Sequence, residues 1–327
     1  MPTEQPEVLL IGPLRPVLAK GFADLAVHEF GDAAGRAASS AASAHIRAMA
    51  VSAPVQPVDD ALFAAFPRLQ IVASFGVGYD HIDAKAAARR GIVVTHTPDV
   101  LTEEVADTAI GLLLNTVREL PQAERYLRAG QWPSDNFPLS RATLRDRTVG
   151  MVGLGRIGIA IARRLDAFGV PVVYHTRQPR PEVGYRHYPR LIDMARDVDT
   201  LMVIVPGGAA TKNMIDADVL AALGPSGIVI NVARGSVIDE PALIAALREG
   251  KILAAGLDVF AAEPQVPAEL LAMENVVLLP HVGSGSEYTR AKMDQLLVDN
   301  IRAWAAGKPP LTPVPETPFR SWQQTWQ

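Results

Sequence analysis

Short apolar runs alternate along the chain with Ala- and Leu-rich stretches that have helical spacing. Several of these runs, such as 200–206 and 275–280, are apolar almost throughout, which is typical of strands that helices cover on both faces. Repeated alternation of strand and helix predicts an α/β fold with parallel, doubly wound, Rossmann-like sheets. The predicted strands are 8–12, 26–30, 46–51, 69–75, 92–96, 148–153, 171–175, 200–206, 227–233, 252–260 and 275–280.

The alternation breaks once, between residues 99 and 146, where no strand is predicted. The segment 102–118 has the pattern of a helix, with Thr102 as the residue that caps its N-terminus and acidic residues in its first turn. A second helix is expected to start at Pro121 and to end at Gly130. We interpret this all-helical interval as the place where the chain crosses from one domain to another.

The chain is therefore expected to form two domains with a cleft between them. Residues 131–147 show neither the periodicity of a helix nor that of a strand, and they should run over the surface. The last helix, from about residue 286 to 307, follows the final strand and should cross back to the first domain. This organisation gives a substrate-binding, flavodoxin-like domain from 1–99 and 286–327, and a dinucleotide-binding Rossmann domain from 100–285.

Composition narrows the class of protein further. The chain has 327 residues, of which 49% are hydrophobic, a formal net charge of -4 and no cysteine. It therefore lacks the basic balance of a nucleic-acid binder, and it can form neither disulfides nor thiolate metal sites. We predict no metal site. The first residues do not have the pattern of a secretory signal and no apolar run is long enough to span a bilayer, so we expect a cytoplasmic protein without membrane or nucleic-acid partners.

A glycine-rich turn connects the predicted strand 148–153 to a helix, and it reads Gly153-Leu154-Gly155-Arg156-Ile157-Gly158. The first glycine permits a tight turn, the second lets a pyrophosphate approach the backbone, and the third allows close packing of helix on strand. The N–H groups at the start of the helix then hold the phosphates. The bare pattern also occurs in ordinary glycine-rich turns, but its place between a strand and a helix favours dinucleotide binding.

The end of the next strand indicates which dinucleotide is bound. An NAD enzyme places an acidic residue there for the ribose 2′-hydroxyl, but residues 174–180 contain no acid. Thr176, Arg177 and Arg180 stand there instead, and a hydroxyl and a guanidinium suit a 2′-phosphate. We therefore expect NADP(H) to be preferred, with NAD(H) possible. The alternative is that Arg177 is a solvated loop residue and that the two cofactors are not distinguished.

Three polar residues follow predicted strands in the second half of the chain: Arg234, Glu263 and His281. The carboxyl ends of strands line the ligand crevice of a doubly wound sheet, so these side chains should converge. Together they fit the reduction of a 2-keto acid, in which a guanidinium holds the substrate, an imidazolium donates a proton and a carboxylate favours the protonated ring. Each residue alone more often has a structural role; the combination predicts catalysis.

Asp258 and the loop 76–78 can each be interpreted in two ways. Asp258, at the end of an apolar run, either contacts the nicotinamide carboxamide or bonds to the local backbone. The glycine-containing loop 76–78, after the predicted strand 69–75, either offers backbone N–H groups to a substrate carboxylate or forms an ordinary turn into a helix that Asp80 caps. We favour the first interpretation of the loop because it is expected to face the ligand cleft.

Long segments such as ASFGVGYDHID, TPDVLTEEVADTAIGLLL, TVGMVGLGRIGIAIARRL, INVARGSVIDEPALIAAL and LLPHVGSG occur in order along the chain. With them the sequence resembles the D-2-hydroxyacid dehydrogenase family, and within it the hydroxypyruvate/glyoxylate and hydroxyphenylpyruvate reductases. The resemblance implies an enzyme that reduces small 2-keto acids to D-2-hydroxy acids, with Arg234 as substrate binder, His281 as acid/base and Glu263 as the partner of His281. It also implies Val77 and Gly78 as backbone ligands of the substrate carboxylate.

The resemblance also implies a set of cofactor contacts and an oligomeric state. Members of the family are typically dimers that pair through the cofactor domain, with the helix 102–118 and the excursion after it. One segment departs from many relatives: Gly207-Gly208-Ala209-Ala210-Thr211 stands where they carry a run like Leu-Thr-Pro-Glu-Thr, which leaves the contacts of this loop open. The candidate cofactor-binding residues are Gly153, Leu154, Gly155, Arg156, Ile157, Gly158, Thr176, Arg177, Gln178, Val205, Pro206, Thr211, Val232, Ala233, Arg234, Asp258, His281 and Gly283.

Two other functions remain as alternatives. A dinucleotide-sensing binding protein or corepressor-like module of the same fold would need an added peptide-binding groove or tail, and the sequence contains nothing that resembles one. An NAD-linked member of the same family, such as a phosphoglycerate or formate dehydrogenase, is disfavoured by the missing acid near residue 176 and by the lack of a regulatory domain. Turnover of NADPH with a keto acid separates an enzyme from a sensor.

Overall fold

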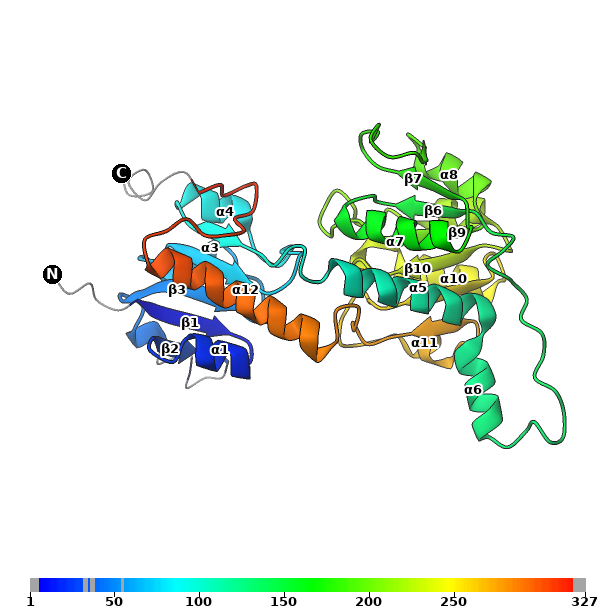
Figure 1. Ribbon diagram of the computed structural model, residues 1–327, viewed down its shortest axis with the longest axis horizontal. Helices are drawn as coiled ribbons and strands as arrows, with labels where there is room; N and C mark the ends of the chain where they lie inside the picture. The colour runs from blue at the N-terminus through cyan, green and yellow to red at the C-terminus, as the bar shows by residue number, and fades with distance from the viewer. Residues whose placement is uncertain (1–5, 32–34, 36–38, 54–55, 320–327) are drawn as a thin grey trace. The chain divides into compact units, whose positions relative to one another are not determined.

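The computed structural model describes residues 6–31, 35, 39–53 and 56–319. The chain divides into two compact units, Met1–Leu101 with Ser286–Gln327, and Thr102–Gly285 (Figure 1). The first crossing thus lies slightly beyond the boundary that the sequence predicted at residue 99. Within the described residues, no helix is both long enough and apolar enough to cross a membrane.

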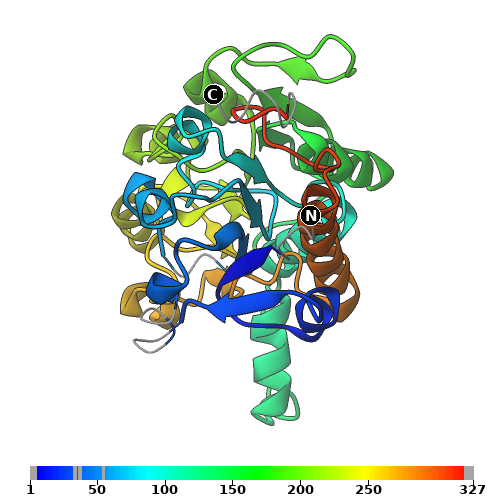
Figure 2. The ribbon, with the colours of Figure 1, turned by 90° about the vertical axis from the view of Figure 1, so that its left-hand side faces the viewer.

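The first unit is built on a five-stranded parallel sheet with the strand order β2-β1-β3-β4-β5. Helices α1 (Pro16–Gly21) and α12 (Glu287–Ala305) lie on one face of the sheet, and α3 (Asp60–Ala65) and α4 (Ala84–Arg89) lie on the other (Figure 2). Because both faces are covered, the strands are mostly apolar along their length. The strands are β1 (Glu7–Ile11), β2 (Ala26–Glu29), β3 (Ile46–Val51), β4 (Ile71–Ser74) and β5 (Val93–Thr95).

Polar side chains cap several helices of this unit. The carboxylate of Asp83 accepts a hydrogen bond from the N–H of Ala86 in the first turn of α4. Asp83, and not Asp80, is therefore the residue that caps this helix. Asp59 caps α3 and Ser286 caps α12 in the same way, which satisfies N–H groups that have no partner inside the helix.

The second unit is built on a seven-stranded parallel sheet with the order β12-β11-β10-β9-β6-β7-β8. The order reverses between β6 and β9, and such a reversal is where a doubly wound sheet binds its ligand. The two-residue strand β8 was not predicted, because its polar residues carry no apolar run. The strands are β6 (Val149–Val152), β7 (Val172–His175), β8 (Arg186–His187), β9 (Thr200–Val203), β10 (Ile228–Asn231), β11 (Ala254–Leu257) and β12 (Val276–Leu278).

Helices also cover both faces of this sheet. Helices α5 (Thr102–Arg118) and α7 (Arg156–Ala167) pack against each other on one face (Figure 1). The other face carries α8 (Leu191–Asp197), α9 (Ala217–Leu223) and α10 (Glu240–Arg248), and the short α11 (Ala268–Ala272) precedes β12. Helix α5 begins at Thr102 itself, so this residue is the first of the helix and not the predicted residue before it. The predicted α/β class with two parallel, doubly wound sheets is confirmed.

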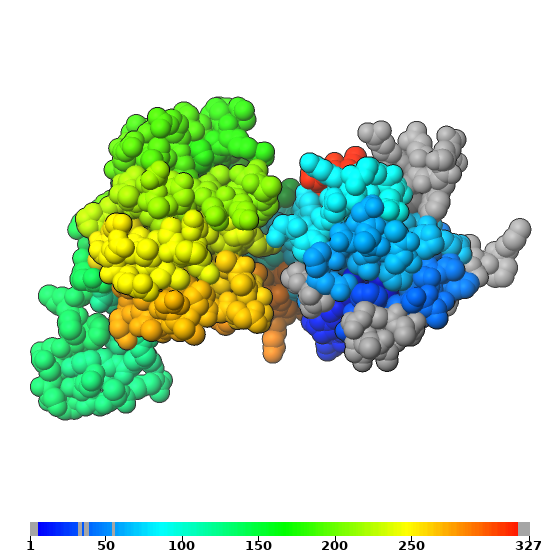
Figure 3. Space-filling model, turned by 180° about the vertical axis from the view of Figure 1, so that it is seen from behind, coloured from blue at the N-terminus to red at the C-terminus, as the bar shows by residue number. Residues whose placement is uncertain are grey.

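A projecting segment follows α5. Helix α6 (Leu120–Arg128) has Pro121 in its first turn, and Gly130 follows its end with a φ of 70°. Residues 131–147 contain no helix or strand. Helix α6 and the chain after it stand away from the body of the second unit, as the teal atoms in Figure 3 show. The segment is thus an excursion over the surface, as its sequence suggested.

Candidate active site

Three neighbouring strands of the second unit lead into the predicted catalytic residues. β10, β11 and β12 lie side by side in the sheet, and the turns after them carry Arg234, Glu263 and His281. Because the strands are parallel, their carboxyl ends share one edge of the sheet. The glycine-rich turn follows β6 at this same edge. The structure therefore gathers the predicted catalytic residues and the predicted phosphate-binding turn on one edge.

The side chains of His281 and Glu263 form a hydrogen-bonded pair. Nδ1 of His281 lies 2.7 Å from Oε2 of Glu263, and Oε1 of Glu263 accepts a hydrogen bond from the N–H of Phe260 at 3.0 Å. Burial raises the pKa of Glu263, but the hydrogen bonds from His281 and Phe260 and the charges of His281 and Arg234 outweigh burial, so the pKa lies below its usual value. An ionised Glu263 makes Nδ1 of His281 a hydrogen-bond donor and leaves Nε2 for another partner.

The backbone at His281 is held in an unusual conformation. Its φ is 53°, in the left-handed region that few side chains adopt. The N–H of His281 donates to the carbonyl oxygen of Asp258 at 2.9 Å, and the carboxylate of Asp258 accepts from the N–H groups of Val282 and Gly283 at 2.7 and 2.8 Å. Burial raises the pKa of Asp258, which is 2% exposed, and these two N–H groups oppose the rise. Both carboxylate oxygens thus bond to local backbone, which is the second of the two interpretations of Asp258; a contact with nicotinamide stays a prediction.

The turn that carries Arg234 is fixed by two residues that the sequence pattern did not indicate, Asn231 and Gly235. Asn231, 1% exposed, accepts a hydrogen bond from the N–H of Ala233 and donates one to the carbonyl oxygen of Arg234, both at 3.0 Å. At Gly235, a Cβ atom would lie 1.9 Å from the carbonyl carbon of Phe260. The Arg234 turn therefore packs directly on the segment whose N–H group holds Glu263. An asparagine that ends an apolar strand and an Arg-Gly pair are the sequence signals that mark this arrangement.

The three glycines of the phosphate-binding turn have three different surroundings. Gly153 has a φ of 99°, and a Cβ atom there would lie 2.9 Å from the carbonyl oxygen of Ile204, just after β9. At Gly158 a Cβ atom would lie 2.8 Å from the carbonyl oxygen of Gly153, whereas at Gly155 it would meet nothing within 4 Å. The outer glycines therefore permit the tight turn and the close packing of α7, and the middle one faces open space. This is the arrangement that lets a pyrophosphate approach the backbone.

The predicted 2′-phosphate residues follow β7. Thr176 donates a hydrogen bond from Oγ1 to the carbonyl oxygen of Gln178 at 2.6 Å. Arg177 is exposed, and no hydrogen bond or ion pair joins its side chain to another described residue. Arg180 instead pairs with Glu182 at 2.7 Å and donates to the carbonyl oxygen of Leu154. Arg180 therefore supports the glycine turn, while the Arg177 guanidinium is available to a ligand.

The remaining candidates for cofactor contact lie along the same edge. Val205 and Pro206 follow β9, and the side chain of Val205 packs against the first glycine of the turn. Oγ1 of Thr211 donates to the carbonyl oxygen of Pro206 at 2.7 Å, which closes the loop where the sequence departs from many relatives. Val232 and Ala233 are buried directly after β10.

In the first unit, the loop after β4 presents two backbone N–H groups. Gly76 has a φ of 116°, and its N–H and carbonyl groups both bond to Thr97 at 2.8 Å. The carbonyl oxygen of Val77 accepts a hydrogen bond from Nδ1 of His96 at 2.9 Å. Among the described residues, the N–H groups of Val77 and Gly78 have no hydrogen-bond partner. Two adjacent unused N–H groups in a glycine-containing loop are typical of an anion-binding nest.

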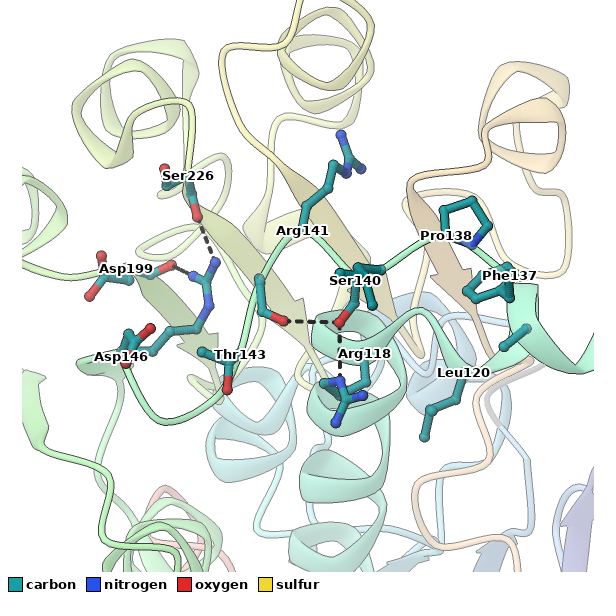
Figure 4. Close-up of a pocket in the computed structure, with 14 residues that line it drawn as sticks. Arg118, Leu120, Phe137, Pro138, Ser140, Arg141, Thr143, Asp146, Asp199 and Ser226 are labelled. Carbon is teal, nitrogen blue, oxygen red and sulfur yellow. Dashed lines mark hydrogen bonds between the residues drawn. The ribbon is translucent and has the colours of Figure 1, made fainter. Parts of the chain in front are cut away.

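A pocket of about 780 Å³ lies at the amino ends of the strands in the seven-stranded sheet, opposite the carboxyl ends that carry the predicted catalytic residues. Three residues that line it, Arg147, Asp199 and Ser226, lie just before β6, β9 and β10. The Arg147 guanidinium donates to the carbonyl oxygens of Asp199 and Ser226 and so joins three strand starts (Figure 4). The other walls come from α5, α6 and the segment 131–147. This pocket is therefore separate from the strand ends that carry the predicted catalytic residues.

Comparisons with known proteins place the chain in a family. Residues 110–283 match the family model "D-isomer specific 2-hydroxyacid dehydrogenase, NAD binding domain". The chain is 48% identical over 256 residues to glyoxylate/hydroxypyruvate reductase A of Arabidopsis thaliana, and 46% identical over 256 residues to hydroxyphenylpyruvate reductase of Plectranthus scutellarioides. In each case the match covers 78% of this chain and 82% of the relative. The chain belongs to the D-isomer specific 2-hydroxyacid dehydrogenase family.

A solved structure is similar over almost the whole chain. The NADPH-dependent glyoxylate/hydroxypyruvate reductase of Sinorhizobium meliloti, in complex with NADP and malonate, has a TM-score of 0.90 and 53% sequence identity. The similarity covers 97% of this chain and 99% of that one. The predicted resemblance and the predicted enzyme class, an NAD(P)-dependent D-2-hydroxyacid dehydrogenase, are thereby confirmed. The roles of individual residues stay predictions. Among the described residues, no group of three or more His, Asp and Glu side chains is placed to hold a metal ion.

Proposed function

We propose that this chain uses NADPH to reduce small 2-keto acids, of the size of glyoxylate and hydroxypyruvate, to D-2-hydroxy acids. In this proposal the second unit binds the dinucleotide and the first unit contributes to the binding of the substrate. The observation that carries the proposal is the hydrogen-bonded pair of His281 and Glu263 on the strand edge that also carries Arg234 and the glycine turn.

His281 acts as the general acid. The carboxylate of Glu263 occupies Nδ1, so the protonated ring presents its second N–H, on Nε2, to the carbonyl oxygen of the substrate. When the carbonyl carbon receives a hydride, this oxygen gains negative charge and takes the proton from Nε2. The carboxylate of Glu263 holds the orientation of the ring before the transfer. Arg234 holds the substrate carboxylate and polarises the carbonyl group through its two-pronged guanidinium.

The residues at the carboxyl ends of β6 and β7 fit the pyrophosphate and the 2′-phosphate of NADPH. NADPH, when bound, supplies the hydride. Gly155 faces open space at the start of α7, a helix that has no side-chain cap and no acidic residue in its first turn. The N–H groups and the positive end of the helix dipole can therefore hold the pyrophosphate. Thr176 and the exposed guanidinium of Arg177 suit the 2′-phosphate. The NADP bound in the Sinorhizobium meliloti relative supports this preference.

The first unit supplies backbone donors that bind the substrate carboxylate. The N–H groups of Val77 and Gly78 hold the substrate carboxylate as backbone donors, and no flexible side chain has to be ordered for this contact. The physiological substrate is expected to be a short keto acid, in line with the glyoxylate/hydroxypyruvate reductases among the relatives.

The proposal includes a cytoplasmic homodimer. The projecting segment exposes apolar side chains: Leu127 is 56%, Trp132 63% and Leu139 94% exposed. Exposed apolar side chains on one segment favour burial against a second copy of the chain. The lack of cysteine fits a reducing compartment. Light scattering should give the mass of a dimer for the wild type and of a monomer for the double variant Trp132→Asp, Leu139→Asp; a dimer in both would contradict this pairing.

Steady-state turnover tests the proposed reaction. The purified protein should oxidise NADPH in the presence of glyoxylate or hydroxypyruvate, and chiral analysis should find the D-isomer of glycerate from hydroxypyruvate. A panel with pyruvate and an aromatic keto acid ranks the substrates. A dinucleotide sensor would bind NADPH and turn over none of them, so binding without turnover would reject the enzyme assignment.

A further inference from the structure

The C-terminal stretch 311–317, called the strap below, closes one edge of the first sheet. It runs from the end of α12 toward α4 and is drawn in red in Figure 1. Pro313 pairs antiparallel with Thr95 of β5, although all strand pairs of this sheet are parallel. The N–H of Val314 donates to the carbonyl oxygen of Val94 at 2.9 Å, and the N–H of Val94 donates to Oγ1 of Thr317 at 2.8 Å. The strap therefore satisfies backbone groups that an edge strand would otherwise leave open.

A buried asparagine in α12 fixes where the strap begins. Asn300 is 0% exposed, and its Oδ1 accepts hydrogen bonds from the N–H groups of Leu311 and Thr312 at 2.9 and 3.1 Å. Its Nδ2 donates to Oγ1 of Thr312 at 2.9 Å, and this hydroxyl donates to the carbonyl oxygen of His96 at 2.6 Å. The strap is thus joined both to the buried side chain of Asn300 in α12 and to the residue that follows β5.

The strap also reaches the loop that carries Val77. The hydroxyl of Tyr79 donates to Oε2 of Glu316 at 2.9 Å. The ring of Tyr79 packs edge-to-face on the ring of His96, with 5.5 Å between centroids. Nδ1 of His96 then donates to the carbonyl oxygen of Val77 at 2.9 Å. Burial and the neighbouring Glu316 raise the pKa of Tyr79 to about 12, so its hydroxyl keeps the proton that this contact requires.

We propose that the strap positions the substrate-carboxylate loop of the first unit, through Glu316 with Tyr79 and through Thr312 with His96. The physical link is the planarity of the peptide bond: the carbonyl of Val77 and the N–H of Gly78 belong to one rigid plane. When His96 holds that carbonyl, it also fixes the direction of the Gly78 N–H, one of the two proposed carboxylate donors. This inference rests on the proposed function, since the loop has a ligand only if a keto acid binds there.

Kinetics of paired variants test the proposal. Tyr79→Phe and Glu316→Ala each remove the contact between strap and loop, so KM for glyoxylate should rise about threefold to tenfold while kcat and KM for NADPH stay within about twofold. Glu316→Gln keeps an acceptor oxygen for the Tyr79 hydroxyl and should restore most of the affinity. The control is Glu29→Ala, an exposed acid on β2 at the opposite edge of the same sheet, which should leave all constants unchanged.

A second variant addresses the peptide plane directly. His96→Phe keeps a ring against Tyr79 but removes the donor to Val77, and it should raise KM for glyoxylate by a similar factor. If the wild type turns over glyoxylate and these variants show an unchanged KM, or if Glu316→Gln behaves like Glu316→Ala, the strap has no positioning role. If the wild type itself shows no turnover, the proposed function fails instead, so the two failures are distinguishable.

Discussion

Along the carboxyl ends of the seven-stranded sheet, the turns after β10 to β12 and the turn after β7 are built in different ways. At β10 to β12, the buried side chain of Asn231 donates to the backbone at Arg234, and the buried carboxylate of Asp258 accepts from the backbone N–H groups that follow His281, so both turns are held in place. At β7, Arg177 extends from an exposed turn, and no described residue pairs with its side chain. Proton transfer requires a precisely placed donor, whereas an exposed guanidinium on a long side chain can adjust its position to a phosphate.

In the proposed mechanism, this contrast separates two kinds of function along the carboxyl edge of the sheet. The β10–β12 end is pre-organised before ligand binds, so changes there should act on the rate of the reaction. At the β7 end the exposed Arg177 side chain has no partner among the described residues, so changes there should act on the choice of cofactor. Variants at β10 to β12 should therefore change kcat, and variants at β7 should change the relative KM values for NADPH and NADH. A variant with the reverse effect would contradict this comparison.

The largest effect is expected from His281→Ala. Loss of the proton donor should lower kcat for keto-acid reduction by about 10²-fold to 10⁴-fold, because no other group holds a proton at that position in the proposed mechanism. Affinity for NADPH, measured by fluorescence titration, should change by less than about threefold. The matched control His45→Ala removes an exposed histidine of the first unit and should leave kcat unchanged. A comparable loss of NADPH affinity in His281→Ala would indicate a structural role for the histidine.

A smaller effect on the rate is expected from Glu263→Gln. The amide keeps an oxygen near Nδ1 of His281 but lacks the charge that strengthens the hydrogen bond orienting the ring, so kcat should fall about tenfold to hundredfold. Steady-state kinetics with glyoxylate measure this loss, and an unchanged kcat would contradict the role of Glu263 as the partner of His281.

The same variant tests the pKa of Glu263 through protein stability. Folding lowers this pKa, so the ionised carboxylate stabilises the fold above its usual pKa, and the contribution is lost as the pH falls through the lowered value. Thermal unfolding should therefore show a gap between wild type and Glu263→Gln at neutral pH that narrows as the pH falls from the usual pKa of a glutamate through the lowered one. A gap that stayed constant with pH would contradict the lowered pKa. Because the Glu263 side chain is 34% exposed, solvent screening should keep this gap small.

The smallest effect is expected at the β7 end. Arg177→Ala should raise KM for NADPH about tenfold, since a charge-assisted hydrogen bond to the 2′-phosphate is lost, and should leave KM for NADH and kcat nearly unchanged. Arg163→Ala, which removes another exposed arginine of the same unit on α7, is the control. An unchanged ratio of the two KM values would refute the assignment of the 2′-phosphate site.

Much of this architecture could be predicted from the sequence, because the signals are local. The apolar runs predicted the strands, and the glycine turn after β6 could be interpreted from its spacing. Asp83 was missed as the cap of α4, since Asp80 lies in the same turn and only the folded chain decides which carboxylate meets the N–H of Ala86. β8 was missed because a two-residue edge strand of polar residues has no pattern.

The supports of the candidate site were harder to predict than its functional residues. Arg234, Glu263 and His281 could be selected because strand ends are where charged side chains carry chemistry. Asn231 and Gly235 act through contacts with the backbone of other turns, and a single sequence does not show which segments meet in space. The pairing of Asp258 with the N–H groups after His281 was one of two interpretations, and only the folded chain distinguishes them.

The close approach at Gly235 limits how this site can be re-engineered. The turn that carries Arg234 and the segment that carries Glu263 touch backbone to backbone. No side chain lies between them that could be made smaller or larger to adjust the spacing. A designer who wished to admit a longer keto acid could not move Arg234 alone, because any displacement would carry Phe260 and with it the partner of His281. If the loop 76–78 binds the substrate carboxylate as proposed, room for a different substrate would have to be sought there, because side chains that can be replaced hold this loop.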